Sequence, residues 1–301
     1  MKSPLNNTGE ATFEKQIFVD EIVESYNRDF GLNVKKYFSN LDKIEIYKCN
    51  DTGYRFYYPF TIPGDSDFYI HFQKFAWYYM PWKWEHKTCA DYIKPEHNIL
   101  EVGCGEGAFL KKIKSQTGAN CVGLELNESC VLNSPQLKIE NILIEDFSKT
   151  NAEKFDLVCT FQVLEHITQI NSFIKAQVDC LKKDGLLVIC VPNNDSDLIK
   201  SDESLLNLPP HHMGLWNEKS LRSLELYFEV KIKSIHYEPL QQYHFDWYIN
   251  AKLKKYFGDF AKNKIMGLLN TFGLKKGIYR YLERRADKII GHSIMAVYQK
   301  V

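Results

Sequence analysis

A short apolar run that ends in the acid Glu101 is followed by glycine at three alternate positions: Gly103, Gly105 and Gly107. An amphipathic stretch, 108–113, comes directly after them. This order of strand, glycine turn and helix opens many doubly wound α/β domains, because the backbone there must turn tightly and approach a ligand without Cβ atoms in the way. The residues therefore predict a site for a ligand that contains a phosphate or a nucleoside.

The acid separates the two kinds of ligand that this turn can hold. A dinucleotide site directs backbone N–H groups at a helix N-terminus toward a pyrophosphate anion. A carboxylate at the mouth of the strand opposes that anion but suits a cationic ligand with hydroxyl groups. The run Gly103-x-Gly105-x-x-Ala108 nevertheless satisfies a dinucleotide pattern, so the glycines alone leave both ligands open.

Further polar residues end or follow the next predicted strands. Glu125 ends the second strand, where a carboxylate can accept two hydrogen bonds from a ribose, as it also does in NAD sites. Asp146 and Phe147 follow the third strand, and Gln162 follows the fourth. Ligands of open α/β sheets bind at the carboxyl ends of the strands, so these residues are expected to share one site.

The Glu-x-Gly-x-Gly-x-Gly run resembles the first motif of class I methyltransferases that use S-adenosylmethionine (SAM), a cofactor with a sulfonium, an ammonium and a ribose but no phosphate. The resemblance covers about 95–235 and the final strand. It implies that Glu125 holds the ribose, that Asp146 accepts from the adenine amino group and that Phe147 flanks the ring. An N-cap at a strand-to-helix turn is the alternative role for Asp146. The implied cofactor site comprises Glu101, Gly103, Cys104, Gly105, Gly107, Glu125, Leu126, Asp146, Phe147 and Gln162.

Residues 162–166, Gln-Val-Leu-Glu-His, resemble the fourth motif of small-molecule methyltransferases typified by the ubiquinone-biosynthesis O-methyltransferases. Some of those enzymes have Glu-x-x-Glu-His, a motif associated with a divalent metal. Gln162 replaces the first acid here, which halves the anionic charge available to a hard cation, so no metal is predicted. Gln162 is expected to contact the cofactor, and Glu165 and His166 are expected to orient the loop.

Residues 208–216 read Leu-Pro-Pro-His-His-Met-Gly-Leu-Trp and lie in the loop after the fifth strand. Such loops resemble those of bacterial methyltransferases that modify sugars and surface polysaccharides. Transfer to a hydroxyl needs a base, and neutral imidazole suits that task, so His211 and His212 are the predicted catalytic residues. Binding acceptor hydroxyls and shaping the pocket are their alternative roles. The expected reaction is methyl transfer from SAM to a small-molecule acceptor, a hydroxyl of a sugar or glycan intermediate.

Two functions from other classes share part of this pattern. An NAD(P)-dependent oxidoreductase of the same sheet type would use the glycines and Glu125, but Glu101 argues against it. A non-catalytic subunit with a SAM-binding fold would have no use for an intact glycine motif.

The elements that must position these residues indicate an α/β fold. Near-continuous apolar strands alternate with helices from 97 to 193, which predicts a parallel sheet covered on both faces. The resemblance completes a doubly wound, seven-stranded, Rossmann-like sheet whose final strand is antiparallel. The core is assigned to 95–245 and 291–301. Its strands are expected at 98–102, 121–126, 139–144, 157–161, 186–191, 230–236 and 292–299.

Residues 1–94 are expected to form an N-terminal extension. Apolar spacing predicts a helix over 11–30, and alternating stretches at 43–49 and 54–58 predict a β-hairpin. An aromatic helical tract at 67–92, divided by Pro81, is interpreted either as core packing or as a lid over the ligand.

A helical insertion is expected at 246–290, between the last two strands. Its central part, 252–288, has eleven Lys or Arg residues against three acids, with apolar residues between them. One interpretation is a pair of amphipathic helices with solvated basic faces. The other is an anionic partner: a phosphate-bearing sugar, a lipid-linked intermediate or the membrane surface.

The composition is that of an ordinary globular protein. The 301 residues contain 38 basic and 38 acidic side chains, which gives no argument for nucleic acid binding, and no recognised RNA- or DNA-binding module accompanies the basic insertion. The eight cysteines show no paired spacing, and three lie in apolar strand-like runs, which suits a reducing compartment and a cytoplasmic protein. No apolar stretch approaches the roughly 20 residues that span a bilayer. The oligomeric state is left open.

Overall fold

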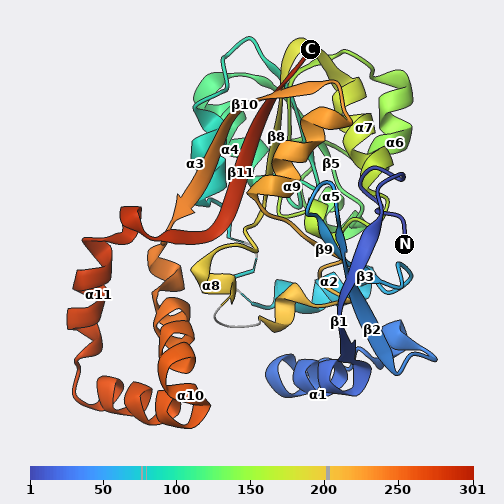
Figure 1. Ribbon diagram of the computed structural model, residues 1–301. Coiled ribbons are helices and arrows are strands. Elements are labelled where there is room, and N and C mark those ends of the chain that lie inside the picture. Colours follow the sequence, from blue (N-terminus) through green and yellow to red (C-terminus); the bar gives the residue numbers. More distant parts are fainter. Residues whose placement is uncertain (76, 79, 201–203) are drawn as a thin grey trace.

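The computed structural model describes residues 1–75, 77–78, 80–200 and 204–301 (Figure 1). A seven-stranded sheet with the order β10-β11-β8-β7-β4-β5-β6 forms its centre. The strands from β8 to β6 are parallel, and β11 is antiparallel to both of its neighbours. The predicted fold class is therefore confirmed. The strands are β4 (Asn98–Val102), β5 (Asn120–Leu124), β6 (Lys138–Glu140), β7 (Phe155–Phe161), β8 (Leu181–Pro192), β10 (Val230–Pro239) and β11 (Ile290–Lys300).

Helices cover both faces of this sheet because successive side chains of each strand point to opposite faces. On one face Ile99 and Cys159 pack with Phe109 of the helix that follows the glycine turn. On the other face Leu100 packs in the same cluster as Phe173. The covering helices are α3 (Trp84–Ala90) and α4 (Ala108–Thr117) on the first face, and α6 (Ile144–Phe147), α7 (Ile170–Cys180) and α9 (Glu218–Arg222) on the second.

The predicted extent of the third strand, 139–144, is wrong. Strand β6 ends at Glu140, and α6 begins at Ile144, whose side chain is buried in the main core. The apolar run in the sequence therefore combines a short edge strand with the first turn of a helix, two elements that a buried run does not distinguish by itself.

The N-terminal residues build a second, four-stranded sheet in the order β1-β2-β3-β9. The predicted hairpin is confirmed, but the helix predicted over 11–30 is wrong in its first eight residues, which form a strand paired with β2. Pairing along β2 satisfies the backbone groups of that stretch, and this tertiary effect outweighs the helical spacing. The elements are β1 (Ala11–Phe18), α1 (Val19–Phe30), β2 (Lys43–Cys49), β3 (Arg55–Tyr58) and β9 (Gly214–Leu215).

Strand β9 belongs to the N-terminal sheet but comes from the loop that contains the adjacent histidines. Phe56 of β3 pairs with Gly214, and the backbone N–H of Tyr57 donates to the carbonyl of Met213. An added Cβ at Gly214 would lie 2.0 Å from the Tyr54 hydroxyl oxygen, so only glycine allows this approach. The N-terminal sheet therefore holds the histidine loop over the central sheet.

The remaining elements complete the chain. The aromatic tract is divided as predicted, with Phe68 and Phe72 of α2 buried in the N-terminal core. The insertion forms two helices that project from the body of the molecule (Figure 1). The helices not yet named are α2 (Ser66–Gln73), α5 (Glu128–Leu132), α8 (Asp197–Lys200) and the two of the insertion, α10 (Phe245–Thr271) and α11 (Lys275–Glu283). None of the described helices is long and apolar enough to cross a membrane.

Candidate functional site

The glycine turn adopts the backbone conformation that the sequence predicts. Gly103, Gly105 and Gly107 all have positive φ, at 77°, 52° and 68°. A Cβ at Gly103 would lie 2.5 Å from a methyl group of Val163, and one at Gly107 would lie 2.4 Å from a methyl group of Leu137. The first and third glycines are therefore required both by conformation and by close packing.

Glu125 lies at the end of β5, directly against this turn. Its carboxylate accepts hydrogen bonds from the backbone N–H of Gly105 and of Asn127, each at 2.8 Å. The structure thus brings Glu125 to the glycines as predicted. Each carboxylate oxygen has two acceptor positions, so both oxygens keep one for a ligand hydroxyl.

Glu101 is buried at the end of β4, with 4% of its surface exposed. Its Oε2 atom has no hydrogen-bond partner among the described residues. Burial, together with the nearby charge of Glu125, raises the pKa of Glu101 well above its ordinary value. A cationic ligand would lower the pKa of Glu101 again, because an opposite charge favours the ionised carboxylate.

Asp146 and Phe147, predicted to contact the adenine, do not directly follow a strand. Both belong to α6, where the Asp146 carboxylate pairs with Lys149 at 2.7 Å and Phe147 is buried in the main core. The cause is the shorter third strand. Asn141 and Ile142 directly follow β6 instead, and the Asn141 amide donates to the carbonyl of Glu125 at 2.8 Å.

The other predicted cofactor residues are Cys104, Leu126 and Gln162. Cys104 is buried next to the glycines, and burial raises the pKa of its thiol. Leu126 is 56% exposed beside Glu125. Gln162 directs its amide toward β11, where it donates to the hydroxyl of Ser293 at 3.2 Å.

The histidine loop brings three imidazoles together, the predicted pair and His166. Their ring centroids lie 4.5–5.0 Å apart in pairs. His166 Nδ1 donates to the carbonyl of His211 at 2.5 Å, because a carbonyl can only accept. One nitrogen from each ring lies within 4.8 Å of the others, a donor set that a divalent metal could use.

The two predicted catalytic histidines differ in how they are bonded. His211 uses both nitrogens: Nδ1 donates to the Leu206 carbonyl at 2.7 Å, and Nε2 lies 2.6 Å from the Tyr78 hydroxyl. His212 Nδ1 donates to the side-chain oxygen of Asn207 at 3.0 Å, and no other hydrogen bond of this ring occurs in the described chain. Burial lowers the pKa of both imidazoles well below 6.5. Both are therefore neutral at physiological pH.

A group of buried acidic side chains adjoins the histidines, and the sequence did not predict it; we refer to these side chains together as the chamber. It is formed by three carboxyl groups from separate elements: Glu85 of α3, Glu165 after β7 and Glu238 of β10. All three are 1–2% exposed. Burial raises the pKa of Glu165 to about 8, that of Glu238 to about 7 and that of Glu85 in the same direction.

Basic and hydroxyl groups surround these acids. Lys83 Nζ lies 3.9 Å from Glu85, and Tyr243 donates to Glu238 at 3.1 Å. His166 Nε2 lies 3.9 Å from Glu165, which links the chamber to the imidazoles. The available signal was topological. Glu238 lies near the end of β10, at the same sheet edge, but Glu85 becomes part of the site only through the packing of α3.

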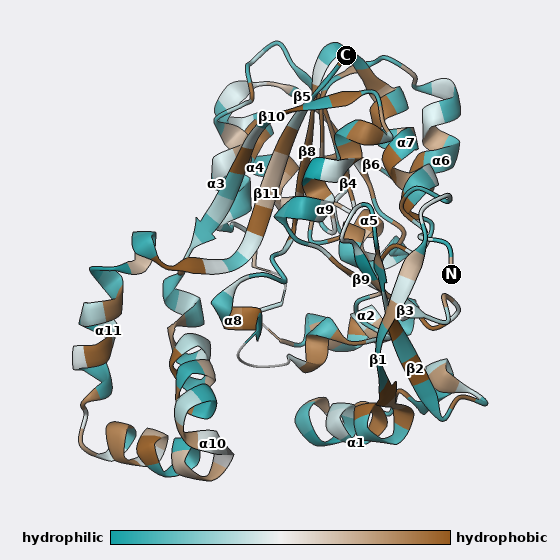
Figure 2. Ribbon diagram, in the orientation of Figure 1, coloured by the Kyte–Doolittle hydropathy of each residue, from teal (hydrophilic) through white to brown (hydrophobic). Residues whose placement is uncertain are grey.

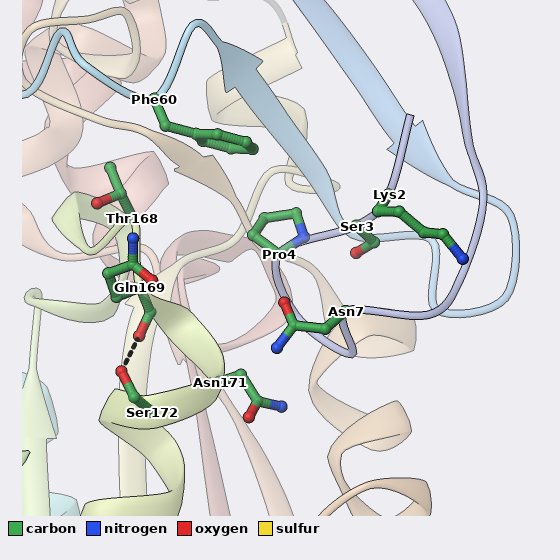
Figure 3. Close-up of a pocket in the computed structure, with 9 residues that line it drawn as sticks. All are labelled: Lys2, Ser3, Pro4, Asn7, Phe60, Thr168, Gln169, Asn171 and Ser172. Atoms are coloured by element: carbon green, nitrogen blue, oxygen red, sulfur yellow. Dashed lines mark hydrogen bonds between the residues drawn. The ribbon is translucent and has the colours of Figure 1, made fainter.

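A surface pocket is lined by other residues (Figure 3). Its volume is about 320 Å³, and its walls come from the N-terminal segment, Phe60 and the first residues of α7. None of its nine lining residues belongs to the glycine turn, the imidazoles or the chamber.

Comparison with known proteins shows the family of the chain. The model of a family described as "Methyltransferase domain" matches residues 77–231, over half of the chain. The chain belongs to this family. It is a class I SAM-dependent methyltransferase, and the site fits the cofactor. The Oε2 atom of Glu101, which has no partner among the described residues, suits a cation, and Gly103 and Gly107 leave no room for a side chain.

Relatives of known name support the small-molecule subgroup. The chain is 31% identical over 167 residues to a ubiquinone biosynthesis O-methyltransferase of Glaesserella parasuis, covering 47% of this chain and 70% of that protein. It is 29% identical over 164 residues to the protein of that name from Haemophilus ducreyi, covering 49% and 69%. Among solved structures, a SAM-dependent methyltransferase of Archaeoglobus fulgidus shares 16% identity with a TM-score of 0.49, covering 78% of this chain and 100% of that chain.

Proposed function

We propose that the protein methylates a hydroxyl group of a sugar or glycan intermediate, with His212 as the general base. The observation that carries the proposal is the neutral imidazole of His212, whose Nδ1 is bonded to Asn207 while its Nε2 has no hydrogen bond in the described chain. This ring lies beside buried carboxyl groups at the carboxyl edge of the sheet. When bound, SAM supplies an electrophilic methyl group. His212 takes up the hydroxyl proton at Nε2, while Asn207 fixes the Nδ1–H tautomer.

The cofactor would be held by the glycine turn and by Glu101 and Glu125. We also propose that Asn141 and Ile142, rather than the pair in α6, border the adenine, since they follow β6 at the same edge as Glu125. We further propose that Gln162 borders both the cofactor and the acceptor.

The chamber supports a polyhydroxylated acceptor. Buried carboxyl groups are unfavourable unless they gain hydrogen bonds, and several hydroxyl groups of one sugar would supply them. Oε2 of Glu165 and Nδ1 of His244, both buried, have no partner among the described residues. The location proposed for this reaction is the cytoplasm, since all eight cysteines are free thiols.

A ring hydroxyl of a quinone precursor is the second candidate acceptor. It is favoured by the names of the relatives, which are ubiquinone biosynthesis O-methyltransferases. Such an acceptor offers fewer hydroxyl groups to the three carboxyls.

The experiment is an acceptor panel analysed by mass spectrometry. Purified protein and SAM are incubated with nucleotide sugars, oligosaccharides and dihydroxyphenols, and products are scored for a gain of one methyl group. Methylation of a saccharide supports the proposal, whereas methylation of the phenols alone overturns it. The His212→Ala variant is the control for base catalysis. Activity that is lost in EDTA and restored by a divalent cation would instead assign the three imidazoles to a metal.

A further inference from the structure

The insertion between β10 and β11 forms an arm, residues 245–289, that leaves the body of the protein (Figure 1). Its root is anchored by a small buried cluster that includes Phe245, Ile249 and Leu282. The helix α10 is interrupted at Gly258, where φ is 74° and ψ is 170°. Beyond this break the chain turns and returns through α11. We call residues 256–281 the distal arm; they include the most exposed apolar side chains of the arm.

The distal arm exposes many large apolar side chains for its length. Phe260 is 76% exposed, Phe272 68% and Leu274 58%. Tyr256, Phe257, Leu268 and Tyr281 are also 55–69% exposed. Figure 2 shows apolar ribbon at the far end of the arm. So many large, exposed apolar side chains within one segment indicate a binding surface rather than ordinary solvent exposure.

Basic side chains surround these rings. Residues 252–288 hold eleven Lys or Arg residues against three acids, although the whole chain is neutral. Lys264 Nζ lies 4.4 Å from the ring centre of Phe260, and the guanidinium of Arg285 lies 4.9 Å from that of Tyr281. The arm therefore presents aromatic and cationic groups side by side, the combination that suits the interface of an anionic bilayer.

We propose that the distal arm docks the enzyme on an anionic membrane surface. Aromatic side chains enter the headgroup region while the lysines and arginines contact lipid phosphates. A second copy of the chain is disfavoured as the occupant, because two arms would bring two like-charged segments together. The proposal does not depend on the acceptor.

The test is co-sedimentation with vesicles of phosphatidylcholine alone and with 30% phosphatidylglycerol. The full-length protein should bind the anionic vesicles, and binding should weaken with salt. The double variant Phe260→Ser/Phe272→Ser removes aromatic groups, and Lys264→Glu/Lys276→Glu reverses charge. The charge variant should lower partitioning at least about ten-fold, because it replaces two attractions to lipid phosphate by repulsions. The aromatic variant should lower it by at least about the same factor, because two apolar rings no longer leave water.

Matched controls lie on the core domain. Leu226→Ser removes an apolar side chain that is 73% exposed, and Lys231→Glu/Lys233→Glu reverses two exposed charges. These controls should bind like the parent, and all variants should keep parental SAM affinity, which reports that they are folded. Lack of binding by the parent, or equal loss in the controls, overturns the proposal. A lipid-free dimer that only the arm variants dissociate would assign the arm to a second copy.

Discussion

The buried carboxyl of Glu165 makes the stability of the protein depend on pH in a way that one substitution should remove. Glu165 is 2% exposed in the loop after β7, and its Oε2 atom lacks a partner among the described residues. Replacing it by Gln keeps the shape and removes the ionisable group. The perturbation therefore isolates the cost of burying this acid.

The magnitude follows from the difference between the folded and unfolded states. Burial raises the pKa of Glu165 from an ordinary 4.5 to about 8. Below pH 4.5 the carboxyl is protonated in both states, so nothing is lost. Between 4.5 and 8 the unfolded chain binds fewer protons, and stability falls by about 1.4 kcal/mol per pH unit, up to about 5 kcal/mol in total.

The assay is denaturant unfolding of the parent and of Glu165→Gln at intervals from pH 5 to 7.5. The free energy of unfolding of the variant should gain about 3 kcal/mol relative to the parent over this range. Glu96→Gln, an exposed acid before β4, is the control and should follow the parent. Parallel pH profiles for Glu165→Gln and the parent would refute the reasoning, whatever their absolute stabilities.

Three further predictions concern the cofactor site and the base. Glu125→Ala should weaken SAM binding by about 1.5–3 kcal/mol in calorimetry, because it removes a doubly bonded carboxylate; unchanged affinity would show that the ribose is held elsewhere. Gly103→Val should abolish SAM binding while circular dichroism shows a folded protein, since its Cβ would meet Val163 at 2.5 Å; a variant that still binds would make this turn purely structural. His212→Ala should lower turnover about 10²–10⁴-fold with parental SAM affinity, and His211→Ala less. Because burial lowers the pKa of His212, parental activity should be constant above pH 6.5 and fall only in acid, and a rise between pH 7 and 8 would contradict this base.

The central sheet could be predicted because its strands are buried on both faces and therefore read as continuous apolar runs. The bounds of β4 were predicted to the residue, and the glycine turn with Glu125 followed from them. The register failed at β6, an edge strand of three residues, where Ile144 is buried from a helix rather than from the sheet. The assignment of Asp146 and Phe147 depended on that register.

The chamber shows a second limit of the sequence. Its acids come from α3, the loop after β7 and β10, and their proximity is set by packing between distant segments. The distinction between His211 and His212 is of the same kind, because it rests on Tyr78 and Asn207 as partners. No local pattern reports such contacts.

The most direct test of the account is a calorimetric titration of the parent protein with SAM and, separately, with NAD. Because the buried Oε2 atom of Glu101 has no partner in the described part of the chain, we predict binding of one SAM per chain and no detectable binding of NAD. Binding of NAD, or no binding of SAM by a folded protein, would contradict the assignment of this site.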